Sequence, residues 1–249
     1  MSDSAALKPW SVRAVNLPEH ADNPIHTDVG AKAAGYPAAI VAGTTVYAYL
    51  THPPAAAWGA RWVTGGGGEL RLTRAVLDDD LVHCSPVGPG AGPIDGADDR
   101  IEARVDGEVK ATLDLWSDRA APAMRPGDDL PDLELDLTEE LGHYGLRAGD
   151  DIDLYRTDDG LAHPALWPTL ANRVFTAHLI TGSWIHTRSR IFHQGPARLG
   201  QRLTIHATVI DRFETRAGKR AVVDVAVMAD GRPVARIEHE ALTELTEGA

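Results

Sequence analysis

The sequence contains a single cysteine, Cys84, among its 249 residues. One cysteine excludes an internal disulfide framework and a metal site built from several cysteines. No apolar run approaches the ~18 residues that a membrane span needs. The first ten residues, MSDSAALKPW, lack the basic and apolar regions of a secretory signal. We therefore expect a cytoplasmic protein that does not enter a membrane.

Basic residues are also scarce relative to acidic ones. The chain has 24 Lys and Arg against 36 Asp and Glu, so its formal net charge is −12. This balance argues against nucleic acid as a partner. It does not exclude an anionic ligand such as coenzyme A, because a local basic patch can hold one on an acidic protein.

Two stretches have the pattern of a buried helix. Apolar residues from Ile40 to Leu50 fall near helical spacing, with small residues between them. We expect this helix to end at Pro53-Pro54 and a second short segment to follow at 55–62. Residues 170–179 are expected to form its counterpart in the second half.

Each helix is followed by alternating strands and then by a hairpin with Asp-Gly at its turn, Asp106-Gly107 and Asp230-Gly231. Asp-Gly between alternating runs is a strong hairpin signal. This repetition indicates two copies of one fold unit. We expect an N-terminal unit at 1–116, a proline-rich and charged linker at 117–131, and a C-terminal unit at 132–249.

The chemically richest stretch is Asn23-Pro24-Ile25-His26, followed by Asp28 and, further on, by Ile40-Val41-Ala42-Gly43. Asn before proline stops a preceding element, because the residue before proline is pushed out of the α region. His26 is therefore expected on a short loop or a single helical turn. Gly43 is expected at the start of the buried helix.

This arrangement resembles the motif of the MaoC-like dehydratases, the family of (R)-specific enoyl-CoA hydratase 2. The resemblance implies an α+β double hot dog: two antiparallel sheets, each wrapped around a central helix. It also implies reversible hydration of trans-2-enoyl thioesters to (R)-3-hydroxyacyl thioesters in fatty acid metabolism, with no metal or redox cofactor. The substrate would be an acyl-CoA or an acyl-carrier protein.

In that family an Asp and the His activate water. The usual Asp lies five positions before the His, where this chain has Ala21; Asp22 lies four before. His26 is the expected acid/base group, and Asp22 takes the acidic role only if its shifted position still reaches the site. Asn23 holds either the water or the loop. Asp28 is expected to cap the following helix.

Gly43, with Ala42 before it, is a candidate for holding the thioester oxygen, because free N–H groups at a helix start suit a developing oxyanion. The alternative is that Gly43 only permits close packing. Arg188 could bind a phosphate of the carrier, although a solvated sheet face is the alternative that we favour. Strand periodicity places His186 and Arg188 on one face.

The second half lacks the motif, since 153–159 reads DLYRTDD with no His. Aligning Ala162–Pro168 with Gly35–Val41 places His163 at the position of Tyr36. We expect one acyl pocket beside His26, partly built by the second half. The alternatives to a hydratase are a non-catalytic protein that binds acyl thioesters and a thioesterase. Whether two such chains form a homodimer is left open.

Overall fold

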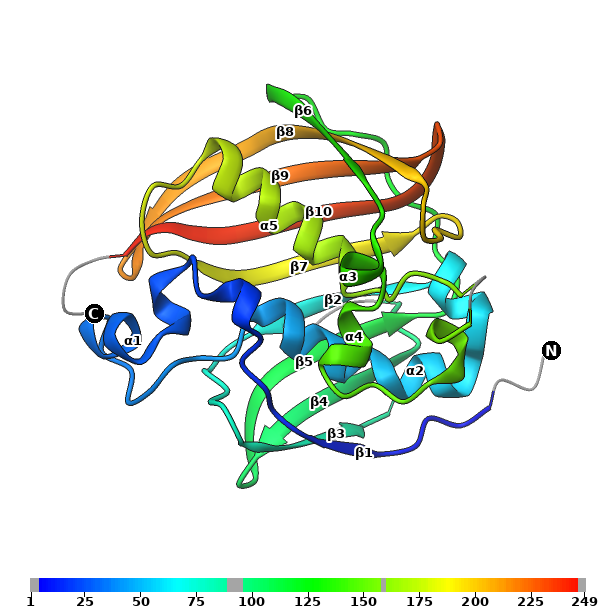
Figure 1. Cartoon of the computed structure of the whole chain (residues 1–249), viewed down its shortest axis with the longest axis horizontal. Coiled ribbons are helices and arrows are strands. Elements are labelled where there is room, and N and C mark those ends of the chain that lie inside the picture. Colours follow the sequence, from blue (N-terminus) through cyan, green and yellow to red (C-terminus); the bar gives the residue numbers. More distant parts are fainter. Residues whose placement is uncertain (1–4, 89–95, 158–159, 246–249) are drawn as a thin grey trace.

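The computed structural model describes residues 5–88, 96–157 and 160–245. Ten antiparallel strands form one continuous sheet in the order β1-β3-β4-β5-β2-β7-β10-β9-β8-β6 (Figure 1). The strands of the first half are β1 (Trp10–Arg13), β2 (Gly67–Leu72), β3 (Leu81–Pro86), β4 (Asp99–Val105) and β5 (Glu108–Trp116). Those of the second half are β6 (Asp128–Asp136), β7 (Ile185–His193), β8 (Arg202–Thr215), β9 (Gly218–Ala229) and β10 (Arg232–Leu245).

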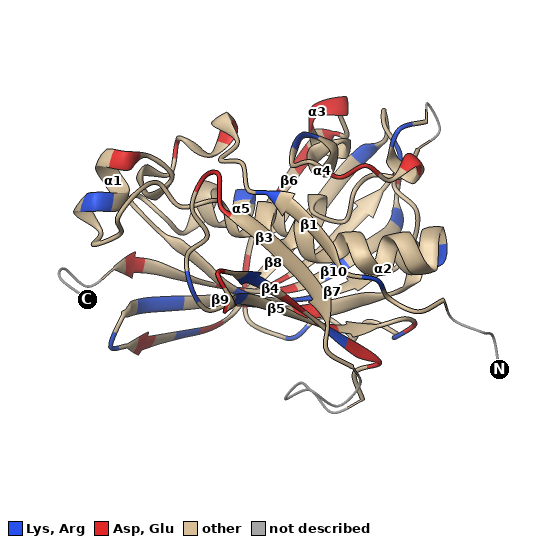
Figure 2. Cartoon of the chain, turned by 90° about the horizontal axis from the view of Figure 1, so that it is seen from below, with Lys and Arg blue, Asp and Glu red and all other residues tan. Residues whose placement is uncertain are grey.

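The helices lie on one face of this sheet (Figures 1 and 2). The two long ones are α2 (Gly43–Gly65) and α5 (Leu166–His178). The short ones are α1 (Asp28–Ala33), α3 (Glu139–Gly142), α4 (Tyr144–Arg147) and the 3₁₀ turns η1 (Pro18–His20), η2 (Pro24–His26) and η3 (Asp153–Tyr155). Among the described helices, none is both long and apolar enough to cross a membrane.

The two halves repeat one strand order. Counting from the junction outwards, the first half reads β2-β5-β4-β3-β1 and the second reads β7-β10-β9-β8-β6. Each half therefore supplies one hot dog with its own long helix, as the sequence predicted. The two sheets are also joined edge to edge, because β2 pairs with β7 from Gly67 and Phe192 to Arg71 and Arg188.

One position of this junction requires glycine. Gly67 has φ +148°, and a Cβ at this position would lie 2.1 Å from the carbonyl oxygen of Ile191 on β7. No side chain fits there, so the close approach of β2 to β7 at position 67 requires glycine. Gly65 ends α2, and the glycines that follow it lead into β2, where Gly67 pairs with Phe192 of β7.

The prediction that α2 stops at its prolines is wrong. The helix continues through Pro53 and Pro54 to Gly65, with one non-helical residue, Gly59, at φ +60°. Proline has a φ that a helix accepts and costs mainly a hydrogen bond and some crowding. Because the helix is buried on several sides around Pro53 and Pro54, packing outweighs that local cost.

The two Asp-Gly turns are confirmed. Asp106 and Gly107 have φ +49° and +80°, and Asp230 and Gly231 have φ +47° and +75°. Two consecutive residues with positive φ form the hairpin turn that matches the twist of the strands.

At the middle of the chain, β6 begins at Asp128, inside the range expected to be a linker. The division into two units with that linker stays a prediction.

Candidate active site

A cavity of about 670 Å³ opens between the two halves. In the first half its wall comes from η1, η2, the start of α2 and the chain after β2. In the second half it comes from α4, α5 and the start of β7. The cavity is lined by His26 and by residues of both halves, which confirms the expectation of a pocket in this place.

His26 is the last residue of η2, a single helical turn that Pro24 opens. Proline suits the first helical position, where its missing N–H is not needed. The Nδ1 of His26 lies 2.7 Å from the carbonyl oxygen of Ile40. Since a carbonyl can only accept, Nδ1 carries the proton and Nε2 carries the lone pair. Burial lowers the pKa of His26, against the opposing effect of the Ile40 carbonyl, so the ring is a neutral base.

Asn23 precedes η2 and ties the site to the second half. Its Nδ2 donates a hydrogen bond of 3.0 Å to the carbonyl oxygen of Trp184. Asn23 is among the residues that line the cavity, and its Oδ1 is buried without a hydrogen-bond partner. A buried acceptor without a partner is costly. The observed contact of Asn23 is the one that holds the loop to the second half.

The two acidic residues of the motif are placed differently. Asp22 is exposed at the rim of the cavity, and the structure records no hydrogen bond or ion pair for it. His26 is thus without a carboxylate partner. Asp28 does not cap α1, contrary to expectation: the Oγ1 of Thr27 accepts from the N–H of Gly30 at 3.2 Å. Asp28 instead accepts from the N–H of Ala39 at 2.9 Å.

The first residue of α2 is Gly43, as predicted, and Ala42 is its N-cap. Both line the cavity. A Cβ on Gly43 would lie 2.4 Å from Cδ1 of Leu72 and 2.9 Å from Nδ1 of His186. Gly43 therefore permits close packing and, at the same place, keeps the positive end of the helix dipole open to the cavity.

Arg188 is not at the cavity. It lies between carboxylates, with Nη2 at 2.5 Å from Glu238 and Nε at 3.3 Å from Glu240. The pairing of β7 with β10 shifts register between its Arg188 and His186 partners, leaving Thr187 as an extra residue. A bulge of this kind re-aims side chains, so His186 is buried and lines the cavity while Arg188 points elsewhere. The expectation that they share a face is wrong.

In the second half, a different side chain occupies the position that corresponds to His26. In the first half, the backbone N–H of Ile40 donates to the carbonyl of Ile25. In the second half, the N–H of Leu161 donates to the carbonyl of Leu154 in the same way. The next residue along, Tyr155, thus takes the place of His26. The bond from Val41 to Val76 is likewise matched by one from Ala162 to Ala197, which places His163 at the position of Ala42 and not, as expected, of Tyr36.

His163 and its neighbours are already paired. Its Nδ1 accepts from the N–H of Ala165 at 3.1 Å, so its Nε2 donates to Asp150 at 3.1 Å. Burial alone would raise the pKa of Asp150, but the hydrogen bond from His163 helps to lower it below its ordinary value. Tyr155 packs on His163 with ring centroids 4.6 Å apart. This buried, hydrogen-bonded cluster occupies the place that corresponds to the His26 site of the first half.

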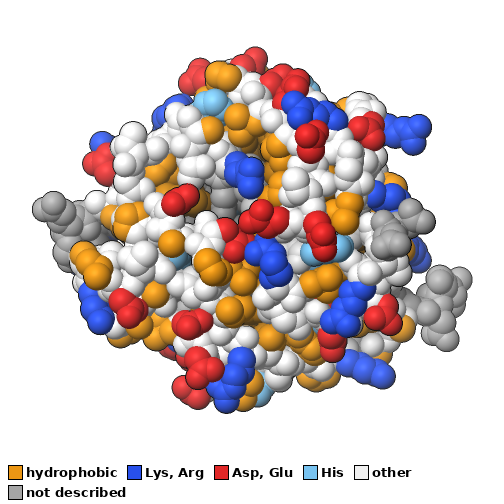
Figure 3. Space-filling model, viewed as in Figure 1, with side chains coloured by type: hydrophobic (Ala, Val, Ile, Leu, Met, Phe, Trp, Pro, Cys, Tyr) orange, Lys and Arg blue, Asp and Glu red, His pale blue; other side chains and the backbone are white. Residues whose placement is uncertain are grey.

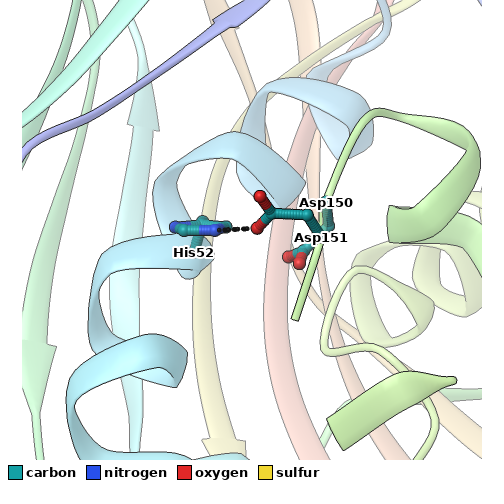
Figure 4. A group of neighbouring side chains, drawn as sticks. All are labelled: His52, Asp150 and Asp151. Atoms are coloured by element: carbon teal, nitrogen blue, oxygen red, sulfur yellow. Dashed lines mark hydrogen bonds and ion pairs between the residues drawn. The ribbon is translucent and has the colours of Figure 1, made fainter. Parts of the chain in front are cut away.

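A group with metal-ligating side chains lies next to this cluster. One ligand atom from each of His52, Asp150 and Asp151 falls within 4.8 Å of the others (Figure 4). The Nε2 of His52 is bonded to Asp151 at 2.9 Å, and the carboxylate of Asp150 is bonded to His163. Because these side chains already make hydrogen bonds within the protein, we assign them a structural role, in which His52 and Asp151 connect α2 to the loop after α4.

Among the lining residues that sequence reasoning did not assign to the site are two histidines and a tyrosine: His20, His186 and Tyr144. His20 lies on η1, and its Nε2 is 2.7 Å from the hydroxyl of Tyr144 on α4. His186 comes from β7. The only local signal for His20 was its place six residues before His26. Tyr144 and His186 belong to the other half, where no spacing in the sequence connects them to the motif.

Comparisons with known proteins were made at the level of sequence and of structure. No family model matches the sequence, and no curated protein matches it. The structure is similar to a MaoC-like dehydratase with TM-score 0.63 and 14% identity, over 97% of this chain and 99% of the other. It is also similar to a conserved protein of Mycobacterium tuberculosis described as a double hot-dog fold, with TM-score 0.64, 13% identity and 96% of each chain covered.

A further similar structure is named as an oleoyl thioesterase from Lactobacillus plantarum. Its TM-score is 0.56 and its identity 11%, over 98% of this chain and 99% of the other. Similarity at these identities establishes the fold, and proteins with different reactions share this fold. The chain is therefore a double hot dog, with the fold of the MaoC-like dehydratases that its Asn-Pro-Ile-His motif resembles.

Proposed function

We propose that this chain is a hydratase/dehydratase that interconverts trans-2-enoyl and (R)-3-hydroxyacyl thioesters. The observation that carries the proposal is the placement of His26. Its Nδ1 is held by the Ile40 carbonyl, its Nε2 is without a protein partner, and both His26 and the start of α2 line one cavity. A base and a helix start together are what water addition to an enoyl thioester needs.

The steps balance with these groups alone. Nε2 of His26 takes a proton from water as the oxygen bonds to C3 of the enoyl chain. The imidazolium then returns that proton to C2, and His26 is neutral again. Negative charge that develops on the thioester oxygen is stabilised by the free N–H groups and dipole at the start of α2. Dehydration is the reverse, and neither direction requires a metal or redox cofactor.

The carrier, coenzyme A or a carrier-protein arm, bears phosphate and would need cations near the cavity mouth. Arg147 and Arg173 line the cavity. Arg147 pairs with Glu19 at 2.5 Å, whereas Arg173 is exposed and has no ion pair among the described residues. On the face that carries the helices, acidic and basic side chains are interspersed (Figure 3). Arg173 is therefore our candidate for the phosphate contact, in place of Arg188.

Replacing Gly43 by alanine is expected to lower kcat/KM by about a hundredfold, the typical effect of moving reacting groups by about 1 Å. The new Cβ would displace Leu72 or His186 at the start of α2. The matched control is Gly65→Ala at the other end of α2, where a Cβ meets nothing within 4 Å. Equal activity of the two variants would show that the thioester oxygen does not lie at Gly43.

Purified protein with a short trans-2-enoyl-CoA tests the proposal, read as loss of enoyl absorbance. A hydratase removes the enoyl absorbance and keeps the thioester. A thioesterase, the activity named for one protein of the same fold, would release free thiol. A protein that only binds thioesters, an alternative suggested by the missing carboxylate, would change neither signal and would still bind the substrate.

A further inference from the structure

His20 occupies the position next to Ala21, where the carboxylate of the motif is missing. Its ring centroid lies 5.6 Å from that of His26, and both side chains line the cavity. No hydrogen bond joins the two rings directly. Nε2 of His26 and Nδ1 of His20 have no protein hydrogen-bond partner, and neither is among the buried polar atoms without one. Each ring therefore offers one nitrogen to the cavity.

The tautomer of His20 follows from the buried hydroxyl of Tyr144. This oxygen lies 2.7 Å from Nε2 of His20, 2.9 Å from Oγ1 of Thr44 and 2.5 Å from Oγ1 of Thr45. A tyrosine hydroxyl donates once and accepts twice. When both threonine hydroxyls donate to it, its own proton goes to Nε2 of His20, and every hydrogen bond is made.

The other arrangement leaves a buried group unpaired. If Nε2 of His20 donated to Tyr144, the tyrosine would have to donate to one threonine, whose own proton would then be without a partner. Thr44 and Thr45 are fully buried, and leaving such a donor unpaired costs about 1–3 kcal/mol. His20 therefore carries its proton on Nδ1, toward the cavity. Burial, together with the nearby His26, lowers the pKa of His20 to about 4, so the ring is neutral.

The two histidines thus present complementary atoms, a lone pair on His26 and an N–H on His20. We propose that His20 replaces the missing carboxylate by holding the reacting water, which accepts a hydrogen bond from Nδ1–H of His20 and donates one to Nε2 of His26. This inference rests on the proposed hydratase function. His20 keeps its proton throughout. The proton of water goes to His26 and then to C2, and the oxygen bonds to C3.

Tyr144 acts through His20 and is a positioning residue. Thr44 and Thr45 come from the first turn of α2, and Tyr144 comes from the second half. The guanidinium of Arg147 lies over the Tyr144 ring at 5.5 Å. The second half therefore contributes to the chemistry by fixing the tautomer of a histidine in the first.

Two variants and one control test the assignment with the full chain and a short trans-2-enoyl-CoA. His20→Phe keeps a ring and removes both nitrogens, and we expect kcat/KM to fall by about ten- to a hundredfold, because the water loses its orientation. Tyr144→Phe should cost less alone and nothing further in a His20→Phe background. The control is His83→Phe, an exposed histidine on β3 that is bonded to Ser11 on β1 and does not line the cavity.

Nitrogen NMR of labelled histidines gives a readout that is independent of turnover. At neutral pH we expect the proton of His20 on Nδ1 in the wild type and a change of its tautomer signal in Tyr144→Phe. A His20→Phe variant as active as His83→Phe, or a His20 proton found on Nε2, would overturn the assignment while leaving the hydratase proposal standing. Failure of the wild type to hydrate any enoyl thioester would instead overturn the proposed function, and this inference with it.

Discussion

Replacing His26 by alanine is expected to lower kcat/KM for enoyl hydration by about 10²–10⁴-fold, the usual contribution of a general acid/base group. The structure places no second base beside His26 within the motif, because Asp22 is exposed and no hydrogen bond or ion pair joins it to His26. The variant should still fold, since His26 is only partly buried and its main hydrogen bond is to one carbonyl. Initial rates and thermal unfolding of the two proteins give the comparison.

The matched variant is Asp22→Asn, which removes a carboxylate from the same loop. Its kcat/KM is expected to stay close to that of the wild type, because the carboxylate does not reach the water held by His26. A loss as large as that of His26→Ala would contradict this account. It would mean that substrate binding brings Asp22 into the cavity.

Acid is expected to destabilise the fold between about pH 6.5 and pH 4, before most carboxylates are protonated. His186, His193 and His239 are fully or almost fully buried. Burial lowers the pKa of His186 to about 3 and of His193 to about 4, and it lowers the pKa of His239 well below its ordinary value. Unfolding exposes them, and each then takes up a proton with a pKa near 6.5.

The sign follows from which state holds more protons. In this range the unfolded chain binds protons that the folded chain excludes, so stability is complete above about pH 6.5 and falls as pH decreases. Each histidine contributes about 2 kcal/mol of destabilisation at about pH 5, and the three together about 6 kcal/mol. That is comparable to the whole stability of many proteins, about 5–15 kcal/mol.

Urea unfolding at neutral pH and at about pH 5 measures this effect. His193 is the histidine best suited to a variant, because it lies outside the cavity wall and its Nδ1 donates to the carbonyl of Trp62 at 2.8 Å. His193→Gln keeps a donor and should reduce the number of protons taken up on unfolding by one. A free energy of unfolding that is flat across this range would show that the buried histidines are hydrated or already charged.

The features that the sequence predicted are local ones. Asp-Gly at a turn needs positive φ at two neighbouring residues, and both turns have it. Two features of the site also follow from neighbouring residues. Pro24 fixes the start of the 3₁₀ turn that carries His26, and the small residues around Gly43 allow α2 to begin there. The repetition of strands and helices was visible for the same reason, because each copy carries its own local pattern.

The features that it did not predict depend on contacts between distant residues. Pro53 and Pro54 remain helical because of what packs around them. The side chain of Arg188 points away from the cavity because β7 has a bulge where it pairs with β10. His20 becomes a candidate for holding the reacting water only because Tyr144, from the other half, is hydrogen-bonded to its ring. None of these outcomes is encoded in spacing along the chain.

The central claim is that the cavity beside His26 adds water to an enoyl thioester, and incubation of an enoyl-CoA in water labelled with heavy oxygen tests it most directly. Mass spectrometry of the product is expected to show one labelled oxygen in a 3-hydroxyacyl chain that is still attached to coenzyme A, formed by the wild type and far more slowly by His26→Ala. Label found instead in a free fatty acid, with coenzyme A released as thiol, would contradict the account and assign hydrolysis to this cavity.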